Sequence, residues 1–553
     1  MARSISTHIF AKAWARAEEL VNDELHPEQA SRRRFISRAG TACGGLLLAG
    51  AMPPVARGRM AEIGAKRPSR SLDDEVAIVG AGFAGLIAAY RLREADVVAK
   101  VYEGDTRVGG RAWTLRGLFN DDQIAEAHAE FIDGYHYTLI RIAREAGLEL
   151  ENLNNIPGGL RTTFDIDGEP YPFWRIVVDL IPVVRMAVRD GARAGWDTTF
   201  YESTPHGRAL DEMSVTEWME TRVSGGMSSR IGQLLDVHIR NEYGMEPAQL
   251  SSLNIVYGLS ALAGDEGGGR GERAGLGQDL ARGRRRSRAL SEDEGPLAVW
   301  HIQGGTDLLS TRLAGALPGQ IELNHRLVSA ATEGARVRLT FDTPGGTVET
   351  RVDRVVLALP FSVLREIDLS GLDLRPEKRN AIDQLGIATN SKLIMQFSDR
   401  HWRTLGKDGD IWSDRDFQAT WDGASVQPGM SGILVDYLGG EFGANFDEGT
   451  PEERAAAFLA DIDPILPGLG DKWNGRVFRV HPTSSPLLRG SYPAYALGQY
   501  STIRGLEPEV EGRVHFAGDH TSLRFQGFLE GAAETGERAA SEILAAMRRR
   551  SRR

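Results

Sequence analysis

The first well-defined pattern along the chain is an apolar run that leads into a glycine-rich turn. Residues 76–79 are apolar and mostly β-branched, which is typical of a parallel strand buried on both faces. The glycine-rich turn occupies 80–85, and the Ala- and Leu-rich stretch 86–92 predicts a helix. A second apolar run over 97–102 predicts a second strand. The order strand, turn, helix, strand is that of a βαβ unit.

Similar patterns recur downstream. Apolar residues at helical spacing predict helices over 135–148, 238–243, 250–262 and, near the C-terminus, up to residue 547. Alternating or continuous apolar runs predict strands over 337–341, 348–360, 391–397 and 432–437, and another strand from residue 514. This mixture of helices and strands predicts an α/β protein, and the sequence contains no internal repeat.

The composition is that of a globular protein and excludes several classes. Of the 553 residues, 41% are hydrophobic and 25% are charged, which excludes a disordered, collagen-like or disulfide-built chain. The length indicates several domains, or one large domain with insertions. The net charge of −11 argues against a general nucleic-acid-binding surface, so we predict no nucleic-acid partner. Because Cys43 is the only cysteine, an intramolecular disulfide, an iron–sulfur cluster and a multi-cysteine zinc site are excluded, and we predict no metal site.

The N-terminal region has the features of an export signal. Residues 31–37 read Ser-Arg-Arg-Arg-Phe-Ile-Ser, a moderately apolar run covers 39–51, and prolines and small residues occupy 53–56. The paired arginines resemble a twin-arginine signal, which the twin-arginine export machinery reads as an address. The apolar run is too short for a good membrane span, and a basic arm ahead of a buried helix is the alternative. We predict a signal peptide over 1–56, a periplasmic or secreted protein, and no stable membrane span.

The residues of the glycine-rich turn have distinct tasks in binding a dinucleotide. Gly80 permits the tight turn, Gly82 lets the backbone approach a pyrophosphate, and Gly85 lets the helix pack on the strand. Ala84 belongs to the same turn, and the N-terminus of the helix offers unpaired N–H groups to the phosphates. Glu103 lies 23 positions after Gly80, near the spacing of a ribose-binding acid. The unit predicts a Rossmann-like domain, and a glycine-rich turn without a ligand is the alternative.

The residues after this unit indicate which nucleotide is bound. Arg107 and the Gly-Gly-Arg triplet 109–111 follow Glu103 after a short loop. Two glycines allow a close backbone approach, and Arg111 can reach a phosphate or the edge of a flavin. This pattern resembles that of flavin amine oxidases and is not expected of a nicotinamide dehydrogenase.

The C-terminal part of the chain contains the second half of this resemblance. Residues 514–519 predict a strand that ends in a Gly-Asp turn, and 526–532 lead into a helix. A helix N-terminus facing a flavin stabilises the negative charge that the ring gains on reduction. The two ends of the chain together resemble the monoamine oxidase and L-amino-acid oxidase superfamily of FAD enzymes, from about residue 73 to residue 547.

This resemblance implies a non-covalent FAD site built from both ends of the chain. The positions that bind adenosine and pyrophosphate are occupied here by Gly80, Gly82, Ala84, Gly85, Glu103, Gly110 and Arg111. Val328 matches the strand beside the adenine, and Gly518 and Asp519 match the turn near the ribityl chain. Some relatives attach FAD to a cysteine just before the first aromatic residue of the substrate site. This chain has Ser491 there, so we predict no covalent link.

The resemblance also implies three catalytic positions. Lys392 matches the lysine that holds a water beside the reactive flavin nitrogen, with a solvated strand lysine as the alternative. Tyr492 and Phe528 match the two aromatic residues that flank the substrate amine, and Phe528 is also expected against the cofactor. Their alternative is two ordinary core aromatics.

Two interleaved domains follow from the same resemblance. A Rossmann-like FAD-binding domain is expected over 73–135, 297–365 and 481–547, and an α+β substrate-binding domain over 136–263 and 366–480. Residues 264–296 are rich in Gly and Arg and have no apolar period, which predicts a flexible surface loop.

The activity that the resemblance implies is the oxidation of a small-molecule amine. The amine is oxidised to an imine, which hydrolyses to a carbonyl compound and ammonia or an amine, while dioxygen is reduced to hydrogen peroxide. An L-amino-acid oxidase and an exported flavin-binding protein with little turnover are the alternatives. A homodimer is a further expectation that the sequence leaves open.

Residues 125–131 bear on the choice of substrate. L-amino-acid oxidases commonly have an arginine here that binds the substrate carboxylate, and this chain has none. That absence favours amines without a carboxylate, although Arg116, Arg240 or Arg524 could reach the pocket from elsewhere. His128 stands where many relatives have glycine, and it would either line the pocket or be an ordinary hydrogen-bonded histidine.

Overall fold

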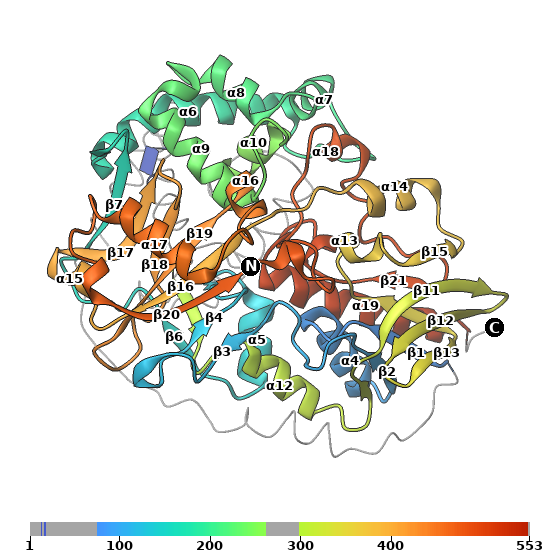
Figure 1. Ribbon diagram of the computed structural model, residues 1–553. Helices are drawn as coiled ribbons and strands as arrows, with labels where there is room; N and C mark the ends of the chain where they lie inside the picture. Colours follow the sequence, from blue (N-terminus) through green and yellow to red (C-terminus); the bar gives the residue numbers. More distant parts are fainter. Residues whose placement is uncertain (1–12, 14–15, 18–73, 261–297, 551–553) are drawn as a thin grey trace, which may run out of the picture.

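The computed structural model describes residues 13, 16–17, 74–260 and 298–550 (Figure 1). The predicted signal peptide lies almost wholly outside these residues, and the predicted Gly- and Arg-rich loop lies entirely outside them. Within the described part, no helix has both the length and the hydropathy that a membrane crossing requires.

A five-stranded parallel sheet contains the predicted nucleotide-binding unit. Its strand order is β10-β2-β1-β14-β21, and every neighbouring pair is parallel. The strands are β1 (Val76–Val79), β2 (Ala99–Tyr102), β10 (Ile321–Glu322), β14 (Arg354–Leu357) and β21 (Val514–Phe516). Because these strands come from distant parts of the sequence, the sheet forms only when the two ends of the described chain meet.

Two helices from opposite ends of the chain pack beside this sheet. Helix α4 (Phe83–Glu94) and helix α19 (Leu529–Arg550) lie side by side in Figure 1, in blue and red. Gly536 allows their close approach, because a Cβ at this position would lie 2.5 Å from the carbonyl oxygen of Ala84. Apolar residues of β1, α4 and α19 belong to one core cluster, which fixes the first and last elements against each other.

A seven-stranded sheet forms a second body of structure, with the strand order β20-β16-β19-β18-β17-β7-β8. Its strands are β7 (Arg161–Ile166), β8 (Glu169–Pro170), β16 (Ser391–Phe397), β17 (Lys407–Ser413), β18 (Ala419–Asp422), β19 (Gly432–Leu438) and β20 (Trp473–Val480). All neighbouring pairs are antiparallel except β7 with β17. Every residue of β16 and β19 is buried. These two strands therefore form the interior of this sheet.

Helices cover one end of this sheet, shown in green in Figure 1. They are α6 (Phe173–Ala194), α7 (Pro205–Asp211), α8 (Val215–Arg222), α9 (Arg230–Tyr243) and α10 (Leu253–Ser260). Helix α9 contacts β7, β17 and β19, and so joins the helical layer to the sheet.

Smaller sheets and short helices complete the described structure. The smaller sheets contain β3 (Thr114–Leu115), β4 (Ala125–Glu126), β5 (Ile132–Asp133), β6 (Leu150–Asn152), β9 (Val299–Ile302), β11 (Arg326–Glu333), β12 (Arg336–Thr343), β13 (Gly346–Val352) and β15 (Asp368–Gly371). The remaining α-helices are α5 (Tyr137–Glu145), α12 (Asp307–Gly315), α13 (Phe361–Leu364), α14 (Pro376–Gln384), α15 (His401–Thr404), α16 (Gly440–Ala444), α17 (Pro451–Ile462) and α18 (Gln499–Thr502).

The predicted fold class, an α/β protein with a Rossmann-like sheet and an interleaved α+β part, is confirmed. The predicted strand 391–397 coincides with β16. The predicted strand 348–360 is wrong as a single element, because the chain breaks between β13 and β14 at Asp353. Strand β15 pairs with β11, so the sheet of β11 extends beyond residue 365, where we expected a domain to end. The division into cofactor and substrate domains stays a prediction.

Candidate cofactor and substrate site

The turn after β1 and the first turn of α4 contain two glycines, Gly80 and Gly85, that exclude a side chain. Gly80 has a φ of +103°, and a Cβ there would lie 2.6 Å from the carbonyl oxygen of Ala358. A Cβ on Gly85 would lie 1.9 Å from the carbonyl oxygen of Gly80. Gly82 differs, because its φ is −72° and no heavy atom lies within 4 Å of an added Cβ. As the N-cap of α4 it supplies no side-chain cap, which leaves the first N–H groups of the helix for an anionic ligand.

Glu103 follows β2 and orders the same turn. Its carboxylate accepts hydrogen bonds from the N–H groups of Ala81, at 2.6 Å, and Asp105, at 2.9 Å. Burial raises the pKa of the Glu103 carboxyl, and the two backbone hydrogen bonds oppose this rise. The carbonyl oxygen of Glu103 accepts a hydrogen bond from the N–H of His325, three residues before Val328. Val328 lies at an irregularity in the pairing of β11 with β12, so these two predicted nucleotide-binding residues are on neighbouring segments.

Arg111 joins three segments that are far apart in the sequence. Its Nη1 donates to the carbonyl oxygen of Ser491 at 2.5 Å and to the Asp519 carboxylate at 3.1 Å, and its Nη2 also pairs with Asp519. Burial alone would raise the pKa of Asp519, but the charge and hydrogen bonds of Arg111, together with the neighbouring His520, hold this pKa below its usual value. One arginine therefore brings together the N-terminal motif, the residue before Tyr492 and the C-terminal acid.

Two other predicted glycines also have positive φ angles. Gly110 has a φ of +54°, and a Cβ there would lie 3.6 Å from the Cα of Gly82. Gly518 has a φ of +133°, and its N–H donates to Oγ1 of Thr535 at 3.0 Å. Gly110 therefore lies against the N-terminal turn, and Gly518 is tied to α19.

Lys392 lies on β16 and is completely buried. Its Nζ donates to the carbonyl oxygens of Glu126, at 3.1 Å, and His128, at 3.0 Å, and forms an ion pair with Glu130 at 2.9 Å. The Nζ lies 5.0 Å from the centre of the Trp421 ring, whose Nε1 donates to the other carboxylate oxygen of Glu130. The alternative of a solvated strand lysine is therefore wrong. The predicted contact of Lys392 with the flavin through water stays a prediction.

Tyr492 and Phe528 lie on adjoining segments. The buried hydroxyl of Tyr492 is 3.2 Å from the hydroxyl of Tyr437. A Cβ on Gly527 would lie 3.4 Å from the Tyr492 ring, so the segment of the half-buried Phe528 passes beside that ring. Tyr437 is also the register partner of Lys392 across β16 and β19. The buried lysine and the predicted aromatic pair therefore share one region, and their catalytic roles stay predictions.

His128 is a buried histidine whose Nδ1 has no hydrogen-bond partner among the described residues. The centre of its ring lies 6.2 Å from that of Trp113. Burial, together with the nearby cations Lys392 and Arg107, holds the pKa of His128 well below the usual histidine value, so the ring is neutral. Of the two alternatives that the sequence left open for His128, the ordinary hydrogen-bonded histidine therefore does not fit.

Two of the three candidate carboxylate-binding arginines are held by acids. Arg116 pairs with Asp307 at 2.7 Å, and Arg240 pairs with Asp236 at 2.9 Å. Arg524 is exposed. Among the described residues, these contacts of Arg116, Arg240 and Arg524 place none of the three guanidinium groups beside Lys392.

Glu130 and Tyr437 are site residues that the sequence reasoning missed. Glu130 neutralises Lys392, and Tyr437 pairs with Tyr492. A signal for Glu130 was present, because a lysine buried in a core strand needs a counter-charge and segment 125–131 contains two acids. Tyr437 has no such signal, since its position opposite Lys392 follows only from the pairing of β16 with β19.

Comparison with known proteins shows which family this chain belongs to. A family model described as flavin containing amine oxidoreductase matches residues 83–544. This chain belongs to that family. It is 22% identical over 501 residues to the flavin-containing amine oxidase A of Equus caballus, over 86% of this chain and 85% of that protein. It is 24% identical over 494 residues to the L-amino-acid oxidase of Mus musculus, over 88% of this chain and 72% of that protein.

A solved structure shares the fold of this chain. The solved structure of cyclohexylamine oxidase from Brevibacterium oxydans IH-35A superposes with a TM-score of 0.71 at 21% identity, over 86% of this chain and 100% of that chain. As a flavin-containing amine oxidoreductase, the protein is an oxidoreductase that acts on CH–NH bonds and uses FAD. The described residues fit this cofactor, because the uncapped start of α4 and the open side of Gly82 suit a pyrophosphate.

Proposed function

We propose that this flavin enzyme oxidises amines that carry no carboxylate, and that dioxygen accepts the electrons and becomes hydrogen peroxide. The observation that carries the proposal is the position of the buried Lys392, opposite Tyr437 and therefore close to Tyr492. Arg111 supports it from the other side, because its hydrogen bond to Ser491 links the residue before Tyr492 to the dinucleotide-binding turn.

The chain's own residues position the amine and keep it reactive. When bound, FAD supplies the redox chemistry, which is the acceptance of a hydride equivalent from the carbon next to the amine nitrogen. Tyr492 and Phe528 flank the amine and align it. The apolar surroundings disfavour a positive charge on the substrate, so the amine binds unprotonated. The imine product hydrolyses to a carbonyl compound and ammonia or an amine.

The substrate class is proposed from the ion pairs of two candidate carboxylate-binding arginines. Arg116 and Arg240 are already paired with acids, and a carboxylate in the pocket would have to compete with Asp307 or Asp236 for them. Burying a carboxylate without a partner costs several kcal/mol. These observations favour amines over amino acids.

The L-amino-acid oxidase alternative is supported by the likeness to the mouse enzyme of that name. The two alternatives are separated by pairs of compounds that differ only in a carboxylate. Suitable pairs are phenethylamine and L-phenylalanine, isopentylamine and L-leucine, and cadaverine and L-lysine. A binding protein with little turnover would oxidise neither member.

Peroxide release and anaerobic bleaching of the flavin are the measurements. For at least one pair we expect kcat/KM for the amine to exceed that for the amino acid about 100-fold or more, because the acid lacks a partner. A higher kcat/KM for the amino acids would select the L-amino-acid oxidase. A yellow protein that no member of the panel bleaches would contradict both enzymatic alternatives.

We further propose that FAD is bound without a covalent link. At the position before Tyr492 the chain has Ser491, and its hydroxyl donates to Oδ1 of Asn390 at 2.8 Å. A serine hydroxyl does not form the thioether that a cysteine would. The sequence contains one cysteine, Cys43, which falls in the predicted signal peptide.

We also propose export by the twin-arginine machinery to the periplasm or beyond, and this part rests on residues 31–56 alone. That route carries folded proteins and so suits an enzyme that loads FAD in the cytoplasm. Replacing Arg32 and Arg33 by lysine should leave the protein in the cytoplasm, as cell fractionation would show. Export of this variant at the normal level would contradict the proposal. A homodimer is a separate proposal, which light scattering of the purified enzyme tests.

A further inference from the structure

A small cavity lies between two buried acids close to Lys392. Its volume is about 20 Å³, and its walls include Glu130, Glu126, His301 and Glu151. A space of this size holds about one water molecule, and a lining with several polar groups favours water over a void. Glu130, on one wall, is the ion-pair partner of Lys392.

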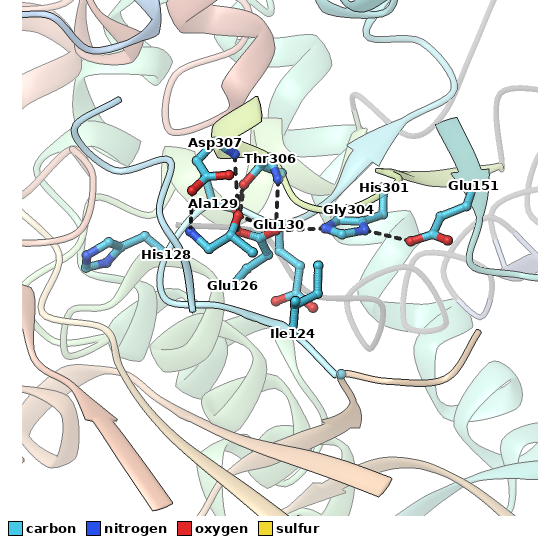
Figure 2. A network of polar contacts seen from close by, with 12 residues as sticks. Ile124, Glu126, His128, Ala129, Glu130, Glu151, His301, Gly304, Thr306 and Asp307 are labelled. Atoms are coloured by element: carbon cyan, nitrogen blue, oxygen red, sulfur yellow. Dashed lines mark hydrogen bonds and ion pairs between the residues drawn. The ribbon is translucent and has the colours of Figure 1, made fainter. Parts of the chain in front are cut away.

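Three of the lining residues, Glu126, His301 and Glu151, form a series of hydrogen-bonded side chains that leads outward (Figure 2). Nε2 of His301 lies 2.9 Å from Oε1 of Glu126, and Nδ1 of His301 lies 2.9 Å from Oε1 of Glu151. The side chain of Glu126 is 2% exposed, whereas that of Glu151 is 25% exposed. The series therefore starts in the interior and ends where solvent can reach it.

The charge state of His301 suits it to pass a proton along this series. Burial would lower the pKa of His301, but the hydrogen-bonded carboxylates of Glu126 and Glu151 raise it to about 10. At neutral pH the ring therefore carries a proton on each nitrogen. An imidazolium in this position can release one proton to a carboxylate on one side and accept another on the other side.

The other polar groups around the cavity are already held. The second oxygen of Glu126 accepts a hydrogen bond from Oγ1 of Thr306 at 2.7 Å. Asp422, on the cavity wall, pairs with Arg403 at 2.9 Å. The step from Glu130 to Glu126 thus crosses the cavity, where a water would be the carrier.

We propose that Lys392, Glu130, a water in the cavity, Glu126, His301 and Glu151 form a path that exchanges protons between the active site and solvent. The proposal rests on the proposed function, in which Lys392 faces the flavin and dioxygen is reduced. Oxidation of the amine releases a hydride equivalent and one proton from its nitrogen. Reduction of dioxygen to hydrogen peroxide consumes that hydride equivalent and one proton. If the proton released by the amine has already escaped to solvent, the path supplies the proton that dioxygen reduction consumes.

A purely structural role is the competing explanation, because the same residues join β4, β6 and β9. Glu151 and His301 are register partners on β6 and β9, so a contact between them is expected in any case. The test therefore needs measurements that follow protons. The contact of Glu542, on α19, with Nδ1 of His515 at 3.0 Å provides a matched control, since the side chain of Glu542 is 25% exposed, like that of Glu151, and lies outside the path.

The experiment uses the holoenzyme and the variants His301→Gln, Glu151→Gln and, as the control, Glu542→Gln. The flavin is reduced photochemically without oxygen, so that no substrate is needed, and is then mixed with dioxygen in a weakly buffered solution. Absorbance follows flavin reoxidation, and a pH-indicator dye follows proton uptake. We expect both rates to fall about 10-fold or more in His301→Gln and Glu151→Gln, with a larger solvent deuterium effect, and to be unchanged in Glu542→Gln.

Rescue separates proton transfer from loss of structure. Acetate or imidazole added to Glu151→Gln should restore proton uptake toward the wild-type rate, because a small acid can replace a partly exposed carboxylate. Wild-type rates of uptake in both path variants would overturn the proposal, and so would a defect that small acids do not relieve. If His301→Gln does not fold, Glu151→Gln alone decides the result. Failure of the proposed function is seen separately, as a wild-type enzyme that amines do not bleach.

Discussion

At the scale of single residues, the charge of Lys392 explains more of the site than any other feature. A completely buried ammonium needs a counter-charge and hydrogen-bond acceptors, and Glu130 with the carbonyls of Glu126 and His128 provides them. The motif around Lys392 could be found from the sequence. Glu130 was missed because it lies 262 positions away, and only the folded chain brings the two together.

This pairing predicts that stability and chemistry can be separated. In Lys392→Met the carboxylate of Glu130 loses its partner, so the free energy of unfolding should fall by about 3–5 kcal/mol. The double variant Lys392→Met/Glu130→Gln removes the unpaired charge and should regain most of this loss. Flavin reoxidation should stay slow in both variants, because the lysine is absent from each. Urea unfolding and stopped-flow absorbance provide the two measurements.

A matched control for this prediction is Lys100→Met. Lys100 pairs with Glu322 at 2.9 Å, but its side chain is 48% exposed, so its loss should change stability by about 1 kcal/mol or less. Wild-type reoxidation in the double variant would remove Lys392 from the flavin chemistry. A double variant as unstable as the single one would show that the unpaired Glu130 is not the cause.

At the scale of elements, the start of α4 shows what a local pattern can predict. The glycines of the turn, the apolar strand before them and the helix after them lie within 20 residues, and β1 and α4 form where the pattern indicates. Strand β16 was predicted to the residue, because it contains a run of apolar residues, Leu393–Met395, and ends in an apolar residue, Phe397. The break between β13 and β14 was missed, since apolar residues continue on both sides of Asp353.

Two alanine substitutions at the start of α4 should affect different properties, one the stability of the apoprotein and the other its affinity for FAD. Gly85→Ala places a Cβ 1.9 Å from the carbonyl oxygen of Gly80, so the apoprotein should lose about 1–3 kcal/mol of stability or fail to fold. Gly82→Ala meets no atom within 4 Å and has an ordinary φ, so the apoprotein should melt as the wild type does. FAD affinity should nevertheless fall about 10-fold or more, because the new methyl group occupies the open side.

Thermal unfolding of the apoproteins and a titration that follows flavin fluorescence measure these two effects. Each variant serves as the control for the other, since both add the same group three residues apart. Undiminished FAD affinity in Gly82→Ala would mean that the pyrophosphate does not approach this glycine. A stable Gly85→Ala apoprotein would mean that the turn can shift without loss.

At the scale of the whole molecule, the cofactor site depends on contacts that no local pattern contains. The terminal motifs could be recognised, and their resemblance to a family predicted that both ends of the chain meet. The middle of the chain has weaker motifs. There, the series Glu126, His301 and Glu151 joins residues up to 175 positions apart, and such a contact depends on sheet pairing rather than on neighbouring residues. The sequence therefore predicted the cofactor better than the groups behind Lys392.

Because the predicted FAD-binding residues come from three separate stretches, removal of FAD should weaken the whole fold. Arg111, Val328 and Asp519 represent these stretches, and Arg111 pairs directly with Asp519. Acid precipitation should release all the flavin into the supernatant, as expected for a non-covalent cofactor. FAD at 100 times its Kd should then stabilise the refolded apoprotein by about 2.7 kcal/mol. At roughly 1 °C per kcal/mol for a chain of this length, the Tm should rise by about 3 °C.

FMN is the control ligand for this prediction. It has the flavin and the ribityl phosphate but lacks the adenosine, which we place beside Glu103 and Val328. At the same concentration it should therefore raise the Tm by less than half as much as FAD. An equal shift with FMN would mean that the N-terminal turn does not hold the adenosine half. Yellow colour that stays with the acid precipitate would contradict non-covalent binding, and since Ser491 cannot form a thioether, it would require another side chain as the point of attachment.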